Sequence, residues 1–283
     1  MGKIITIPSS IEEIDKTIDL VDGFIIGIKD MCVNSNFNIS DLDILNTIKD
    51  KDIFINMNKN FHNNELYKVK ELLIKLNDYN IKGVIFYDIG LFNIYKELDL
   101  NYDLVISQEH SLTSYNTINY WNKKGISYAH ISSDITINEV EKIINNSSSK
   151  LMINLFGYLP MFVSKRHIVK NYLDYFKLND NSKVNYMEKE DKVYPIIDNS
   201  IATEVYSNNI LNGIKYSLID IDYIILNSFN IELDKFISII EMFKSVNKDN
   251  IDEYNNKINN MFTNVDYGFL EKKTIYKVKN EKA

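Results

Sequence analysis

The sequence contains a single cysteine, Cys32, among 283 residues. One cysteine excludes an internal disulfide, and it excludes an iron–sulfur cluster held by this chain alone, because such clusters need several cysteine ligands. No apolar run approaches the roughly 20 residues of a transmembrane helix, and the N-terminus shows no signal peptide. These absences predict a cytoplasmic protein with no membrane partner.

The sequence also lacks the motifs of several enzyme classes. It has no Gly-x-Ser-x-Gly nucleophile elbow, no zinc-binding His-Glu-x-x-His and no glycine-rich phosphate loop. His62, His130 and His167 have no His or Cys partner at metal-ligand spacing, so we expect no metal site. The net charge of -7 and the pI near 5.2 argue against holding nucleic acid by bulk electrostatics.

Short, continuous apolar runs alternate with longer segments of helical period. Continuous runs are typical of parallel strands that are covered on both faces. The runs are residues 4–7, 24–28, 53–57, 83–87, 104–106, 128–131, 151–155 and 223–226. Alternation predicts an α/β protein with a parallel sheet, and eight units permit closure into a (β/α)8 TIM-like barrel. An open doubly wound sheet is the structural alternative.

The segments between the runs predict the helices. They are residues 10–20, 40–48, 63–76, 91–98, 117–124, 136–144 and 164–176, followed near the C-terminus by 233–243 and 251–260. Ser10 to Glu13 comes close to a capping box, and Thr136 to Glu139 fits one fully.

One connection is irregular, because the chain between Phe176 and the last apolar run is far longer than an ordinary barrel loop. It comprises an excursion over residues 177–206 and an expected helix near 208–218. Such an excursion is too long for a plain connection and usually covers another part of the protein. We therefore predict a barrel domain over residues 1–263, with this long excursion before the last strand, and a C-terminal tail over 264–283.

Polar side chains follow nearly every predicted strand, where the loops of a barrel build the active site. His110, beside Glu109, is the predicted acid/base, and Asp134 and Asp88 are the other catalytic candidates. Substrate-binding candidates in these loops are Ser9, Lys29, Asn58, Lys59 and Tyr158. This variety suits a polar small molecule or a flipped-out base better than a long polyanion.

The chain has one arginine, Arg166, in the segment 156–166 that also holds Pro160, one of three prolines. The planar guanidinium binds carboxylate or phosphate bidentately. Arg166 is expected at the start of a helix, where backbone N–H groups favour anions. We therefore predict an anion site at Lys165 and Arg166. The alternative is that Arg166 only caps a helix or pairs with a surface acid.

The segment 155–166 resembles the signature region of the collagenase-like peptidases, peptidase family U32. Further blocks resemble the family in the same order along the chain, at residues 8–10, 27–29, 56–60, 86–90, 132–136, 267–270 and 274–279. The departures are the missing cysteines, with Pro160 where one is expected, and Ser133 in place of an arginine beside Asp134. The chain is thus similar to a short, cysteine-free branch of the family.

The resemblance implies a function in tRNA modification. Relatives are oxygen-independent hydroxylases, and the branch is most similar to proteins that form 5-hydroxyuridine at the wobble position using prephenate. It implies prephenate as co-substrate, bound through Arg166, Lys165, Lys29 and Lys59, with no cofactor held by this chain. The expected partners are tRNA and a longer, cysteine-bearing paralogue that would carry any cluster. The lysine-rich residues 272–282 either touch tRNA phosphates or form a solvated terminus.

Two other functions stay open. The first is that of a collagenase-like peptidase or other hydrolase. Against it, no nucleophile–base pair or metal set is visible in the sequence. In the second, the chain is a non-catalytic partner subunit of the paralogue, which the missing cysteines favour.

Overall fold

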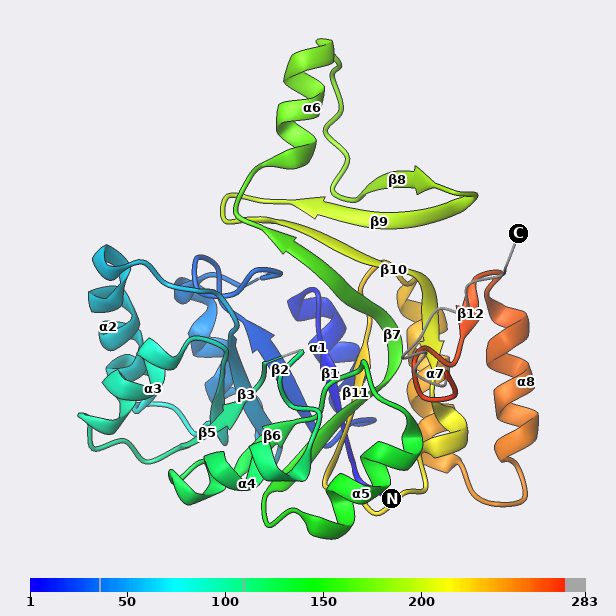
Figure 1. Ribbon diagram of the computed structural model, residues 1–283, viewed down its shortest axis with the longest axis horizontal. Coiled ribbons are helices and arrows are strands. Elements are labelled where there is room, and N and C mark those ends of the chain that lie inside the picture. Colours follow the sequence, from blue (N-terminus) through cyan, green and yellow to red (C-terminus); the bar gives the residue numbers. More distant parts are fainter. Residues whose placement is uncertain (36, 109, 273–283) are drawn as a thin grey trace, which may run out of the picture.

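Eight parallel strands close into a barrel in the computed structural model, which describes residues 1–35, 37–108 and 110–272 (Figure 1). The strands are β1 (Lys3–Ile7), β2 (Gly23–Gly27), β3 (Asp52–Met57), β4 (Gly83–Phe86), β5 (Asp103–Ile106), β6 (Tyr128–His130), β7 (Lys150–Ser164) and β11 (Tyr223–Asn227). Closure comes from β11, which pairs in parallel with both β1 and β7. The predicted barrel is confirmed, and the open sheet is wrong.

Helices cover the outside of the barrel. They are α1 (Ile11–Thr17), α2 (Leu66–Leu76), α3 (Ile89–Lys96), α4 (Tyr115–Lys123), α5 (Ile137–Asn146) and α7 (Leu233–Ser245), with the short 3-10 turn η2 (Asn63–Glu65) before α2. The helix expected at residues 40–48 is instead the 3-10 helix η1 (Ile39–Asn46), whose Ser, Asp, Ile and Asn residues are weak α-helix formers.

The two capping predictions differ in outcome. The Ser10 side chain accepts from the Glu13 N–H at 3.2 Å and caps α1. Thr136 is the N-cap of α5, but its side chain makes no capping hydrogen bond. The Ile137 N–H donates to the Leu270 carbonyl at 2.9 Å, so the C-terminal segment satisfies the first helical donor.

Apolar side chains fill the inside of the barrel up to the site. Those on the inner face are Ile5, Ile25, Phe54, Ile85, Val105, Tyr128, Met152, Tyr223 and Ile225. Three of them, Ile25, Ile85 and Ile225, also line the cavity at the barrel mouth. The inner core is therefore the floor of that cavity, and the larger core lies between strands and helices.

The irregular connection is a β arm that stands over the barrel mouth (Figure 1). β7 runs past its barrel portion and pairs antiparallel with β10 (Thr203–Asn212), which continues the sheet to β9 (Lys192–Asp198) and β8 (Asn185–Lys189). α6 (Ile168–Phe176) lies at the far end. The helix expected near residues 208–218 is wrong: β10 is followed by the 3-10 turn η3 (Ile214–Tyr216). Pairing with β7 overrides the local pattern there.

The described part of the predicted tail packs on the barrel domain. After α8 (Ile251–Met261), β12 (Val265–Asp266) pairs with β10, and Leu270 is buried. The boundary at residue 263 stays a prediction. Residues 273–283, which hold most of the lysine-rich end and the block at 274–279, lie outside the described residues. Within the described ranges, no helix is long and apolar enough to cross a membrane.

Candidate functional site

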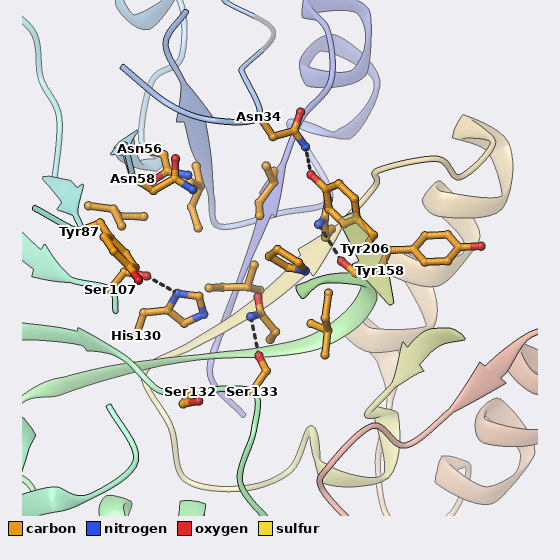
Figure 2. A pocket seen from close by; sticks show the side chains of 18 of the residues that line it. Asn34, Asn56, Asn58, Tyr87, Ser107, His130, Ser132, Ser133, Tyr158 and Tyr206 are labelled. Carbon is orange, nitrogen blue, oxygen red and sulfur yellow. Dashed lines mark hydrogen bonds between the residues drawn. The ribbon is translucent and has the colours of Figure 1, made fainter. Parts of the chain in front are cut away.

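A cavity of about 110 Å³ lies at the carboxyl ends of the barrel strands. We call it the barrel pocket (Figure 2). Its lining is rich in amides, aromatic hydroxyls and titratable groups: Asn34, Asn56, Asn58, Asn154, Asn227, Tyr87, Tyr158, Tyr206, His110, His130, Asp134 and Glu204. Among the described residues, no lysine or arginine lines it. The pocket therefore suits a polar ligand that carries no negative charge.

Two buried polar atoms in the barrel pocket have no hydrogen-bond partner among the described residues. They are Asn56 Oδ1 and His130 Nε2. Ser107 Oγ lies 3.0 Å from His130 Nδ1, so the other ring nitrogen alone is unpaired. Buried polar groups are nearly always paired with protein, water or ligand. These two atoms therefore mark where a ligand with its own donor and acceptor fits.

Burial lowers the pKa of His130 to about 4, and the neighbouring Asn154 side chain opposes this only in part. The charged imidazolium loses its hydration inside the pocket, which is why the neutral form is favoured. At neutral pH, His130 therefore offers one donor and one acceptor nitrogen.

This shift predicts a pH-dependent stability. Between the ordinary pKa of 6.5 and the folded value of about 4, the unfolded chain binds a proton that the folded protein does not. The free energy of unfolding should therefore fall as the pH falls through this window, and this contribution is fully present only above about pH 6.5. Between pH 7 and pH 4.5 we expect wild type to lose about 2–3 kcal/mol more than His130→Gln, measured by urea unfolding. Equal losses in the two proteins would show that His130 is not held neutral.

A second polar group in the pocket comes from the arm. Glu204 on β10 is only 2% exposed, and the Tyr206 hydroxyl donates to its Oε2. Asn34 Nδ2 donates to the same hydroxyl at 2.5 Å. Burial first, and then the charge of Glu204, raises the pKa of Tyr206 well above its usual value. Tyr206 therefore stays protonated. The two hydrogen bonds that link Asn34, Tyr206 and Glu204 fix a carboxylate at the pocket wall.

Four of the predicted site residues come together. His110, Asp134, Asn58 and Tyr158 all line the barrel pocket. His110 Nδ1 lies 2.6 Å from Asp134 Oδ2, and their side chains are 63% and 43% exposed. This histidine–carboxylate pair is at the rim, open to solvent, whereas His130 is inside.

Ser9 and Asp88 are used in local structure instead. The Ser9 N–H and hydroxyl both donate to Glu13 Oε2. Asp88 accepts from the backbone N–H groups of Phe61 and Gly90, at 2.8 and 2.7 Å, and caps α3. Neither residue lines the barrel pocket, so their predicted roles in the site gain no support from their positions.

The predicted cations lie outside the barrel pocket. Lys59 and Lys165 line an adjacent cavity of about 340 Å³, the outer cleft, which shares Asn58, Tyr87 and His110 with the pocket. Lys59 pairs with Glu65, and Lys165 Nζ donates to the Asn60 carbonyl at 3.0 Å. Lys29 and Arg166 are exposed and line neither cavity. Helix α6 begins at Ile168, two residues after Arg166, with His167 as its N-cap.

The fold brings together one pair that the sequence did not reveal. Ser107 and His130 follow or end neighbouring strands β5 and β6, and their side chains meet at 3.0 Å. This serine–histidine contact was not visible in the sequence, because only the fold places the two side chains together. Cys32, in contrast, is fully buried, and burial raises the pKa of its thiol to about 12, so it stays protonated. Within the described chain, no group of three or more His, Cys, Asp or Glu side chains is placed to hold a metal ion.

Comparison with known proteins adds the evolutionary context. The sequence model of peptidase family U32 matches residues 26–269. The tRNA hydroxylation protein P2 of Bacillus subtilis (strain 168) is 24% identical over 253 residues, which are 79% of this chain and 81% of that protein. The solved structure of the U32 peptidase Mk0906 superposes with a TM-score of 0.52 at 12% identity, covering 80% of this chain and 92% of the other.

Proposed function

Because this chain belongs to peptidase family U32, we propose that it takes part in hydroxylating the wobble uridine of tRNA to 5-hydroxyuridine, alone or with a longer, cysteine-bearing paralogue. Its distant relation to a tRNA hydroxylation protein supports this proposal. The wobble uridine and the prephenate co-substrate rest on the family resemblance.

The single observation that carries the proposal is the barrel pocket, which has no lysine or arginine among its described lining residues and holds two unpaired buried atoms. Enzymes that modify a base extrude it from the stack and read its hydrogen-bonding edge in a pocket. On uracil this edge presents an N3–H donor between two carbonyl acceptors. The donor matches Asn56 Oδ1, and a carbonyl matches His130 Nε2–H when Ser107 donates to Nδ1. A neutral base needs no cation, in agreement with the lining.

The chemistry requires a co-substrate. Replacing the C5–H bond of uracil by C5–OH adds one oxygen atom and removes two electrons from the base. In the proposal, prephenate is the co-substrate, and the paralogue supplies any redox group. Prephenate carries two carboxylates, and Lys59 and Lys165 in the outer cleft are the nearest of the predicted cations to the pocket. Lys29 and Arg166 are not part of this proposed site.

Deleting the gene should abolish 5-hydroxyuridine and its derivatives in bulk tRNA, measured by nucleoside mass spectrometry. A plasmid copy of the wild-type gene should restore them. Unchanged nucleosides in the deletion strain would contradict the proposal. The plasmid copy should also be tested in a strain that lacks the paralogue. If 5-hydroxyuridine returns only when both genes are present, the chain belongs to a two-component system.

A second candidate, hydrolysis, is favoured only by the Ser107–His130 contact. Two observations argue against it. The serine faces Nδ1 of His130, and no carboxylate among the described residues is hydrogen-bonded to the ring, so the Ser–His–Asp arrangement of a serine hydrolase is not formed. Ser107→Ala separates the two functions. A serine hydrolase would lose peptide cleavage completely, whereas tRNA modification should be reduced but not abolished, because Ser107 then only orients His130 and sets its tautomer.

A further inference from the structure

Helix α6 buries no residue, whereas every other α-helix in the described chain buries at least two. Its nine residues are fewer than the roughly 12–15 that an isolated helix needs to be even marginally stable in water. Two hydrogen bonds tie its start to the arm: the Ile168 N–H to Thr203 Oγ1, and the Lys170 N–H to Asp198 Oδ2. The rest of the helix projects from the arm (Figure 1).

Three aromatic side chains cluster on the projecting part. Tyr172, Tyr175 and Phe176 are 57%, 80% and 54% exposed. Phe176 lies 4.8 Å from Tyr172 and 4.9 Å from Tyr175, measured between ring centroids. Exposed aromatic groups of this kind mark an interaction site rather than a folded core.

The charge around these rings selects the partner. Residues 165–178 hold four cations, Lys165, Arg166, Lys170 and Lys177, and one acid, Asp174. Two further acids, Asp180 and Asp198, lie beside Lys170, so the local net charge is +1 (4 − 3) in a chain of net charge -7. Asp174 pairs with Lys170 at 2.6 Å, and the side chain of Arg166 has no ion pair in the described ranges. A local basic patch with aromatic faces, on an otherwise acidic protein, is the pattern of a surface for single-stranded nucleic acid.

We propose that this α6 surface, formed by Arg166, Tyr172, Tyr175, Phe176 and Lys177, is the docking site for an RNA loop. Unpaired bases stack on the three rings, and the cations contact the phosphates. The inference rests on the proposed function in naming tRNA as the RNA. The arm rises from the barrel mouth (Figure 1), so a loop held on α6 lies on the side of the protein where a neighbouring nucleotide enters the barrel pocket.

The test is binding of a fluorescent, unmodified tRNA anticodon stem–loop to the full-length protein, followed by anisotropy. The triple variant Tyr172→Ala, Tyr175→Ala, Phe176→Ala should bind at least about tenfold more weakly, since stacking contributes about 1–3 kcal/mol per base. The matched control is Tyr67→Ala with Tyr120→Ala, two tyrosines that are 58% and 57% exposed on α2 and α4 of the barrel wall. The control should bind as wild type does.

A second variant tests the charges without removing a ring. Arg166→Gln with Lys177→Gln should lower the salt dependence of binding, the slope of log K against log salt, by about 1.4 for two phosphate contacts. Circular dichroism and melting temperature monitor folding, and the charge variant keeps the test valid if the triple variant unfolds.

Wild-type affinity in both variants, or no RNA binding by wild type, would overturn the inference. If the triple variant binds RNA normally but changes the sedimentation of the protein from dimer to monomer, the occupant is a second copy, and the RNA proposal is wrong. The proposed function fails separately: RNA binding through α6 together with unchanged nucleosides in the deletion strain would refute tRNA hydroxylation and leave the docking site standing.

Discussion

Asn56→Leu should leave the protein as stable as wild type or more stable, and should lower tRNA hydroxylation by about tenfold to a hundredfold. Asn56 Oδ1 is buried without a partner among the described residues. An unpaired buried acceptor costs about 1–3 kcal/mol, and an apolar side chain of similar shape removes that cost. The same change deprives a bound base of its partner, a loss of about 1–3 kcal/mol in the complex.

The opposite behaviour of stability and activity is what separates a binding role from a structural one. The matched control is Asn227→Leu in the same pocket. Asn227 is satisfied: its Nδ2 donates to the Tyr158 carbonyl and its Oδ1 accepts from the Phe229 N–H. Its leucine variant should lose about 1–3 kcal/mol of stability, because two backbone groups are left unpaired.

Urea unfolding gives the stabilities, and complementation of the deletion strain with nucleoside mass spectrometry gives the activity. An Asn56→Leu protein that is destabilised like Asn227→Leu, or that fully restores 5-hydroxyuridine, would sink the base-reading role of Asn56.

Gly157→Ala should destabilise the protein by about 3 kcal/mol or more, through two effects that add. Gly157 has φ +111, where an L side chain is strained by about 1–3 kcal/mol. A Cβ at this position would lie 2.4 Å from the Asn227 carbonyl oxygen, and relieving such an overlap costs a further 1–3 kcal/mol, roughly. The overlap falls where β7 leaves the barrel and its register with β11 shifts.

Gly125→Ala is the control for the backbone term alone. Gly125 also has positive φ, +92, but a Cβ there meets nothing within 4 Å. It should lose only about 1–3 kcal/mol. Thermal and urea unfolding of both variants measure the difference, and the explanation would fail if the two alanine variants were equally stable. Because Gly157 adjoins Tyr158 and faces Asn227, its variant should also lose tRNA modification.

The sequence by itself determined the barrel. Each of the eight continuous apolar runs is a strand, with most ends within one or two residues of the prediction, because burial on both faces leaves an uninterrupted apolar signature. It also indicated His110, Asp134, Asn58 and Tyr158, since residues that follow parallel strands gather at one end of a closed barrel. The family followed from blocks spread in order along the chain.

The inside of the pocket was decided by the tertiary structure. His130 and Asn56 sit within or at the end of apolar runs, so their pattern resembles core, and only barrel closure shows that they face a cavity. Glu204 and Tyr206 reach the pocket because β10 pairs with the extended β7, about 40 residues earlier in the chain, and local propensity carries no information about such a pairing. The position of Arg166 was likewise decided by the tertiary structure. Composition identified this arginine as unusual, but it lies on the projecting arm, outside the pocket, because β7 ends only at Ser164. Periodicity records which residues are buried, whereas the partner of a buried polar group is fixed only when distant strands meet.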